Sequence, residues 1–240
     1  MGIIFVNLHS RKMFFACGQD VQFVNCGTDE FFMIKNLLFD LGGVIMDIEK
    51  ANCVRAFDAL GLPDAASFFG EYSQQGPFEA LESGAIGPGT FRGEIRALIP
   101  DGEAISDRKI DQAFEAFLTG IPLHRLAALR SLRKKYGLYM LSNTNPIMWN
   151  GFIAAQFSQE GMRRSDYFDG ITTSFAAKCL KPARGIFDYA ATTMEIDPAE
   201  TLFLDDSETN CRAAMSYGWQ ALHVPVGTEF MDLLKEKGVI

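Results

Sequence analysis

The chain has 240 residues, of which 48% are hydrophobic and 22% are charged, and its formal net charge is −8. This apolar content is enough to bury a sizeable core, which argues against an intrinsically disordered chain. The acidic surplus argues against a nucleic-acid-binding protein, because a phosphate backbone requires a basic face. No uninterrupted run of about 18 apolar residues predicts a membrane-spanning helix.

The five cysteines are scattered along the chain, and no two of them form a C-x-x-C pair. Their odd number and irregular spacing argue against a disulfide framework or a zinc site. The first residues are apolar, but the basic pair Arg11–Lys12 follows them, which is the reverse of the order in a secretory signal. We therefore expect a protein of the reducing cytoplasm.

Residues 1–34 are predicted to be an N-terminal extension, because no sustained strand or helix period runs through residues 1–32. Two interpretations are open. The weak alternation at 21–24 allows an accessory strand pair. The clear apolar strand that follows Met33 favours a loosely attached extension with Met33 as the natural first residue. No chemistry is assigned to this segment.

Residues 48–123 are predicted to form an all-helical module. Apolar residues recur at helical spacing, and no strand pattern interrupts them. The expected helices cover 54–60, which ends at a glycine, 91–99, which stops at a proline, and 110–118.

Outside this module, helices and strands alternate. The expected elements are a strand at 37–39, a helix at 123–136, strands at 138–141 and 171–175, a helix at 183–194, a strand at 201–204, a helix at 208–217 and a strand at 221–224. Such alternation predicts an α/β fold with a parallel, doubly wound sheet. The core is then residues 35–47 plus 124–240, and the helical module is an insertion after the first strand.

Polar side chains follow four of the predicted strands. In an open parallel sheet, ligands bind beyond the carboxyl ends of the strands. Any one of these residues alone is usually a turn or cap residue. The ordered set at four strand ends predicts a site made of Asp40, Ser142 with Asn143, Lys181, and Asp205 with Asp206.

These residue types suit phosphoryl transfer. An ionised Asp40 can attack phosphorus and form an aspartyl-phosphate. Together with Asp205 and Asp206 it makes a hard oxygen site suited to Mg²⁺, which neutralises the repulsion between the nucleophile and an anionic phosphate. Lys181 and the Ser142 hydroxyl can hold the remaining phosphate oxygens.

The ordered motifs D-L-G-G-V, L-S-N, K-P and L-D-D resemble those of the haloacid dehalogenase superfamily of hydrolases, and the helical insertion resembles the C1-type cap. The resemblance implies Asp40 as nucleophile, Ser142 as the phosphate-binding hydroxyl and Lys181 as the charge stabiliser. The implied metal ligands are Asp40, the carbonyl of Gly42, Asp205 and Asp206. The residues expected beside the substrate are Gly42, Gly43, Asn143 and Asp47.

One position departs from the usual phosphatase pattern. Gly42 stands where most phosphatases of this superfamily carry a second Asp as general acid and base. Such a group contributes roughly 10²–10⁴-fold to the rate, so we expect a slow enzyme or a preference for good leaving groups. Similar motifs occur in members that resemble sugar-1-phosphate phosphatases, including those for α-glucose 1-phosphate. Asp47 is a candidate replacement acid, although a hinge or cap-contact role is favoured.

Further candidates lie near the predicted site. Lys178 stands where relatives usually have glycine, so either the loop backbone differs or this lysine adds positive charge near the phosphate. In the insertion, Phe78, Glu79 and Glu82 are candidates to face the site, although packing and helix-surface roles are favoured. Trp149 is expected either at the pocket entrance or in the core.

The sequence therefore predicts a Mg²⁺-dependent phosphatase for a small phosphorylated metabolite, most plausibly a sugar phosphate. We expect a monomer or homodimer without nucleic-acid or membrane partners. Three alternatives stay open: a phosphosugar mutase, a 2-haloacid dehalogenase and a catalytically weak protein that binds a phosphorylated ligand or a partner. Gly42 argues against the mutase, the paired acids Asp205 and Asp206 against the metal-free dehalogenase, and the intact Asp40 against the binder.

Overall fold

The computed structural model describes residues 4–7, 12–15, 34–70 and 74–240. They belong to two compact units, Met1–Met33 and Ile34–Ile240. In the first unit, β1 (Ile4–Asn7) pairs antiparallel with β2 (Lys12–Phe15). An accessory strand pair is one of the two interpretations left open for residues 1–32, but it is not expected at these positions, because strands of four residues are too short to establish a period. The alternation at 21–24 lies outside the described residues.

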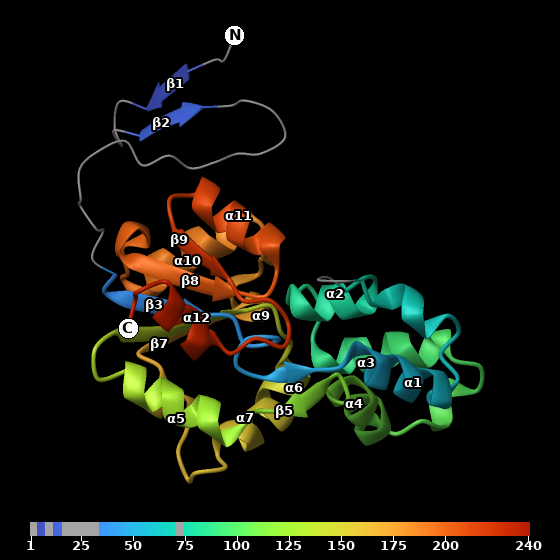
Figure 1. Cartoon of the computed structure of the whole chain (residues 1–240). Helices are drawn as coiled ribbons and strands as arrows, with labels where there is room; N and C mark the ends of the chain where they lie inside the picture. The colour runs from blue at the N-terminus through green and yellow to red at the C-terminus, as the bar shows by residue number, and fades with distance from the viewer. Residues whose placement is uncertain (1–3, 8–11, 16–33, 71–73) are drawn as a thin grey trace. The chain divides into compact units, whose positions relative to one another are not determined.

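The second unit is built on a five-stranded sheet with the order β7-β6-β3-β8-β9 (Figure 1). All four neighbouring pairs are parallel, which confirms the predicted sheet. The strand expected at 171–175 ends two residues earlier, because Ser174 begins a short helix. The strands are β3 (Asn36–Phe39), β6 (Gly137–Ser142), β7 (Gly170–Thr173), β8 (Thr201–Asp205) and β9 (Gln220–His223).

Alternate side chains of the central strand β3 enter two separate hydrophobic clusters. Phe39 packs edge-on against Phe230, with ring centroids 5.3 Å apart, whereas Leu38 belongs to the cluster that contains Phe187. Helices α5 and α12 therefore cover one face of the sheet, and α10 and α11 cover the other (Figure 1). This burial on both faces is why the strands are nearly continuous apolar runs.

Several helices of this core are shorter than the sequence pattern predicts. For example, the helix expected at 123–136 ends at Leu132. None of the helices in the described residues is long and apolar enough to cross a membrane. The core helices are α5 (Leu123–Leu132), α6 (Pro146–Asn150), α7 (Phe152–Phe157), α8 (Arg164–Tyr167), α9 (Ser174–Ala177), α10 (Arg184–Met194), the 3₁₀ turn η3 (Pro198–Glu200), α11 (Glu208–Ser216) and α12 (Phe230–Glu236).

The inserted segment folds around a cluster of phenylalanine rings. Phe78 is fully buried, and its ring centroid lies 4.7–5.2 Å from those of Phe57, Phe69, Phe91 and Phe114. Four of these rings come from the four α-helices of the insertion and Phe69 follows its first 3₁₀ turn, so the cluster holds these helices together. Its helices are α1 (Lys50–Leu60), η1 (Ala65–Phe68), α2 (Pro77–Glu82), α3 (Pro88–Leu98), η2 (Gly102–Ala104) and α4 (Asp107–Glu115).

The insertion is not purely helical, which corrects one expectation. The helix expected at 110–118 stops at Glu115, and β5 (Leu118–Gly120) pairs antiparallel with β4 (Asp47–Ile48). The chain enters and leaves the insertion through these two segments, and pairing satisfies their backbone hydrogen bonds. We propose that the pair marks the junction between a core of residues 35–47 plus 124–240 and a cap of residues 48–123.

Replacing Phe78 by alanine is expected to lower the free energy of unfolding by about 3–5 kcal/mol, because it leaves a cavity among four aromatic neighbours. Leu98→Ala provides the control, since Leu98 is 41% exposed and its truncation should change stability by about 0.5 kcal/mol at most. Urea denaturation of both variants measures the difference. Equal, small effects would contradict the cluster's role in stabilising the cap.

Candidate active site

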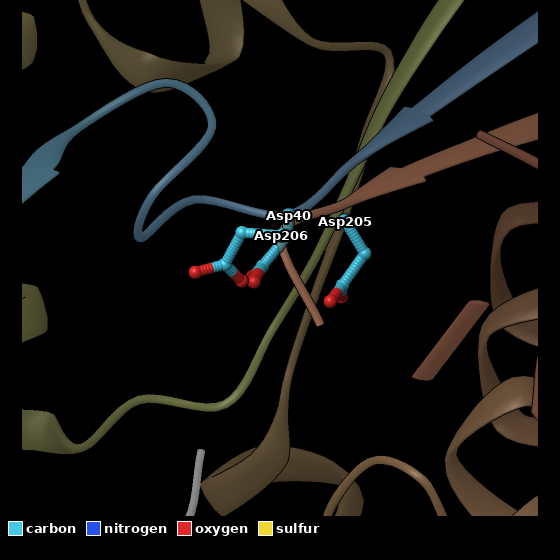
Figure 2. Close-up of side chains that lie close together, drawn as sticks. All are labelled: Asp40, Asp205 and Asp206. Atoms are coloured by element: carbon cyan, nitrogen blue, oxygen red, sulfur yellow. The ribbon is translucent and has the colours of Figure 1, made fainter. Parts of the chain in front are cut away.

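Three aspartates meet at the carboxyl ends of two adjacent strands. Asp40 follows β3, Asp205 ends β8, and Asp206 comes next. Since β3 and β8 are parallel and in register, Asp40 and Asp205 reach the same edge of the sheet. One carboxylate oxygen from each of the three lies within 4.8 Å of the others (Figure 2). The structure therefore brings together all three predicted carboxylates.

The ammonium group of Lys181 lies between two of these carboxylates. Its Nζ is 2.9 Å from Oδ1 of Asp40 and 2.6 Å from Oδ2 of Asp205, and its side chain is 1% exposed. The loop that carries Lys181 is attached to the end of β6 by Asn143. The side-chain oxygen of Asn143 accepts from the Lys181 backbone N–H at 2.9 Å, and its amide donates to the Lys181 carbonyl at 3.1 Å.

Further hydrogen bonds orient the carboxylates. Oδ1 of Asp205 accepts from the backbone N–H of Ser207 at 2.8 Å and from the side-chain amide of Asn210 at 3.0 Å. Oδ1 of Asp40 accepts from the backbone N–H of Leu41 at 2.7 Å. These hydrogen bonds fix the orientation of the Asp40 and Asp205 carboxylates.

The site carries more negative than positive charge. Burial raises the pKa of Asp40 to about 8, and the carboxylates of Asp205 and Asp206 add to this rise although Lys181 opposes it. Burial and Asp205 likewise raise the pKa of Asp206 to about 6. The carboxylates in turn raise the pKa of Lys181 despite its burial. Three clustered oxygen donors with uncompensated charge are a suitable set for a hard divalent cation.

A cavity of about 110 Å³ opens above this cluster, between the core and the insertion. Core residues form one part of its wall, and residues of the insertion form the other. The predicted residues Ser142 and Asn143 line it. Its other lining residues include Asp40, Gly42, Gln74, Glu82, Met148, Ile153, Lys181 and Asp206.

A model of the haloacid dehalogenase-like hydrolases matches residues 34–218. The chain belongs to this family. It is 36% identical over 202 residues to D-ribitol-5-phosphate phosphatase of Bacteroides thetaiotaomicron. The aligned region covers 84% of this chain and 97% of that protein.

Two solved structures of family members share this fold over more than four-fifths of the present chain. A haloacid dehalogenase family enzyme of Bacteroides thetaiotaomicron, in complex with magnesium and inorganic phosphate, is 37% identical with a TM-score of 0.77 and covers 83% of this chain and 98% of that chain. A predicted hydrolase of the family from Porphyromonas gingivalis is 29% identical with a TM-score of 0.79, covering 85% and 98%.

The two glycines of the family motif after Asp40 have different surroundings. Gly43 has φ +74°, and a Cβ atom there would lie 2.2 Å from Oδ2 of Asp206, so only glycine lets that carboxylate approach. Gly42 lines the cavity, and a Cβ there would make an ordinary 3.4 Å contact with Ile48. Glycine at 42 is therefore not imposed by space, and this position offers no proton donor.

Asp47, predicted near the substrate, does not line the cavity of this hydrolase. Its side chain is 53% exposed, and Oδ1 accepts from Nη1 of Arg125 at 2.7 Å. The buried guanidinium of Arg125 also binds both carboxylate oxygens of Glu229. A buried cation needs such partners, and this requirement holds Asp47 at the junction between core and insertion.

The structure separates the two interpretations of Lys178. Its backbone is left-handed, with φ +56°, which is the conformation that a glycine adopts most easily. Its Nζ donates to the carbonyl of Gly84 in the insertion at 2.5 Å, and the residue does not line the cavity. Trp149 also lies outside the cavity wall, beneath the guanidinium of Arg164, whereas its neighbour Met148 lines it.

Glu82 lines the cavity, although the sequence favoured a packing or helix-surface role for it. Among the three candidates of the insertion, Phe78 is in the aromatic cluster and Glu79 is exposed, but Glu82 is buried and lines the cavity. Burial raises its pKa to about 8. The available signal was its spacing, because a residue four positions after the buried Phe78 lies on the same helix face.

The thermal midpoint of the Mg²⁺-free protein is expected to fall as the pH rises from 5 to 8. The raised pKa values of Asp40, Asp206 and Glu82 mean that the folded protein binds more protons than the unfolded chain in this window, so deprotonation destabilises it. Mg²⁺ should therefore raise the midpoint more at pH 8 than at pH 5.

Differential scanning fluorimetry at the two pH values, with and without Mg²⁺, measures this dependence. Asp206→Asn is the control, since it removes one of the competing charges and should reduce both the pH dependence and the Mg²⁺ effect. If Mg²⁺ raised the thermal midpoint equally at both pH values, the raised pKa values of these carboxyl groups would be contradicted.

Proposed function

We propose that this hydrolase is a Mg²⁺-dependent phosphatase that acts on a small sugar or sugar-alcohol phosphate through an aspartyl-phosphate on Asp40. The observation that carries the proposal is the position of Asp40, which borders the cavity and contacts the ammonium of Lys181 beside two further carboxylates. The relative named D-ribitol-5-phosphate phosphatase supports the substrate class. The similar enzyme solved with magnesium and inorganic phosphate supports the ligands.

The donors at the strand ends suit magnesium. We propose that Asp40, Asp205, Asp206 and the carbonyl of Gly42 are the residues that hold it. The three carboxylates offer hard oxygen ligands. Burial is the main cause of the raised pKa of Asp40, and the negative charges of Asp205 and Asp206, which a divalent cation would offset, add to it. When bound, Mg²⁺ supplies charge neutralisation, so that an anionic nucleophile and an anionic phosphate can approach.

The chain's own residues divide the remaining work. The Asp40 carboxylate attacks phosphorus, and the contact with Lys181 favours its ionised form. Lys181 and the Ser142 hydroxyl donate to phosphoryl oxygens, on which negative charge is carried through the transition state. Asn143 positions Lys181 through the paired hydrogen bonds between them. Water then hydrolyses the aspartyl-phosphate and regenerates Asp40.

The cavity is suited to a small substrate. Its volume of about 110 Å³ is below the usual few hundred cubic ångströms of pockets for drug-sized ligands. Oε1 of Gln74 is buried and has no hydrogen-bond partner among the described residues, so it is available to accept from a substrate hydroxyl. Met148 and Ile153 provide apolar contacts for the carbon chain. Hydroxylated metabolites of a few carbons fit this lining.

We propose a monomer or homodimer of the cytoplasm with no nucleic-acid or membrane partner. The net charge of −8 supports the absence of nucleic acid. Cys53, Cys179 and Cys211 are free thiols, which supports a reducing compartment.

Asp40→Asn is expected to abolish phosphate release, with a loss of at least about 10³-fold, because the amide cannot form the aspartyl-phosphate. The assay is Mg²⁺-dependent phosphate release from a panel that pairs sugar 1-phosphates with ribitol 5-phosphate and sugar 6-phosphates. Asp58→Asn, an exposed change on α1, is the control and should keep wild-type activity. Turnover that survives in Asp40→Asn would refute the nucleophile, and a wild-type protein inactive on the whole panel would refute the proposed function.

A further inference from the structure

The insertion contributes one carboxyl group to the wall of the catalytic cavity. Glu82 is the last residue of α2, it is 8% exposed, and it borders the same cavity as Asp40, Gly42 and Lys181. Among the described residues, it forms no ion pair. A buried carboxyl without a cationic partner is costly in its charged form and therefore favours the protonated form, and titratable groups perturbed in this way are common at functional sites.

The core holds Glu82 in place over the cavity. The Ser174 hydroxyl donates to the Glu82 carbonyl at 2.7 Å and accepts from the Thr144 backbone N–H at 3.0 Å. Two residues further along the insertion, the Gly84 carbonyl accepts from Lys178 at 2.5 Å. The turn that carries Glu82 is therefore attached to the core at two points, which favours a defined position of its side chain.

The direction of the proposed reaction places the leaving group beside the insertion. Asp40 approaches phosphorus from the core side of the cavity, and phosphoryl transfer keeps the attacking and leaving oxygens roughly in line. The leaving oxygen then points away from the sheet, toward the part of the wall that Gln74 and Glu82 form. Gly42 provides no acid on the core side, so a proton for this oxygen has to come from elsewhere.

We propose that Glu82 is the general acid and base of this hydrolase, and this inference rests on the proposed phosphatase function. As the Asp40 oxygen bonds to phosphorus, the bond to the leaving oxygen breaks, and that oxygen keeps the electron pair and takes the Glu82 proton. An alcohol and a Glu82 carboxylate result. The carboxylate then accepts a proton from the water that attacks phosphorus. The bond to Asp40 breaks, phosphate leaves, and Glu82 is protonated again.

The surroundings of Glu82 favour its protonated form at neutral pH. Burial raises its pKa to about 8, the side chain of Asn145 opposes this rise, and the negative charge of Glu79 adds to it. The Nδ2 group of Asn145 makes no hydrogen bond of normal geometry within the described residues. The other titratable groups that act on or face Glu82 are Cys53 of α1 and, around the cavity, Asp40, Lys181 and Asp206.

The test compares a poor leaving group with a good one. The second-order rate constant kcat/KM is measured with Mg²⁺ for ribitol 5-phosphate and for 4-nitrophenyl phosphate, whose nitrophenolate leaves without a proton. Glu82→Gln is expected to lower kcat/KM for ribitol 5-phosphate by roughly 10²–10⁴-fold and to leave the aryl ester within about threefold. Glu94→Gln, an exposed change on α3, should alter neither rate constant.

The pH profiles give a second readout that needs no variant. In the wild type, kcat/KM for ribitol 5-phosphate should fall above about pH 8, where Glu82 loses its proton, while the aryl ester lacks this fall. If kcat/KM fell in the same way above this pH for both esters, the inference would be overturned even if Glu82→Gln failed to fold. Equal losses on both esters, or no loss on either, would overturn it too. A wild type that hydrolyses neither ester would refute the proposed function itself.

Discussion

The site depends on one buried interaction, the contact of the Lys181 ammonium with the carboxylates of Asp40 and Asp205. Three carboxylates so close together repel one another, and removing their common cation would leave buried charges uncompensated. The contact forms only because β3 and β8 are neighbours and because Asn143 attaches the Lys181 loop to β6. The order of the strands therefore determines which charged side chains lie next to one another.

The insertion completes a site whose charged cluster belongs to the core. Its residues enclose the cavity, and Ser174 and Lys178 bind its turn beside Glu82. This enclosure lowers the local dielectric, which strengthens the interactions of Lys181 and also favours a neutral carboxyl on Glu82. Lys181 thus opposes the rise in the pKa of Asp40 that burial causes, whereas Glu82 forms no ion pair among the described residues.

The parallel sheet and most of the core site could be predicted because their signals are local. An apolar run followed by a polar residue shows both where a strand ends and which side chain reaches the sheet edge, as at Asp40, Ser142 and Asp205. Predictions failed where a distant segment competes with the local pattern. The helix expected at 110–118 stops at Glu115, because the chain after it pairs with β4 instead. For Asp47, by contrast, the sequence favours a hinge or cap-contact role, and its side chain pairs with Arg125 instead of lining the cavity.

Short motifs and their order are enough to predict the family resemblance, the α/β fold with its inserted helices, and the carboxylate and lysine set at the strand ends. Contacts between distant segments determine which acidic side chain of the insertion lines the cavity, and they bring Lys178 to the Gly84 carbonyl rather than to the catalytic cavity. Glu79 and Glu82 stand three residues apart on one short helix, yet one is exposed and the other buried. The spacing from Phe78 indicates that Glu82 shares its buried helix face, but no period in the sequence shows that this face borders the catalytic cavity.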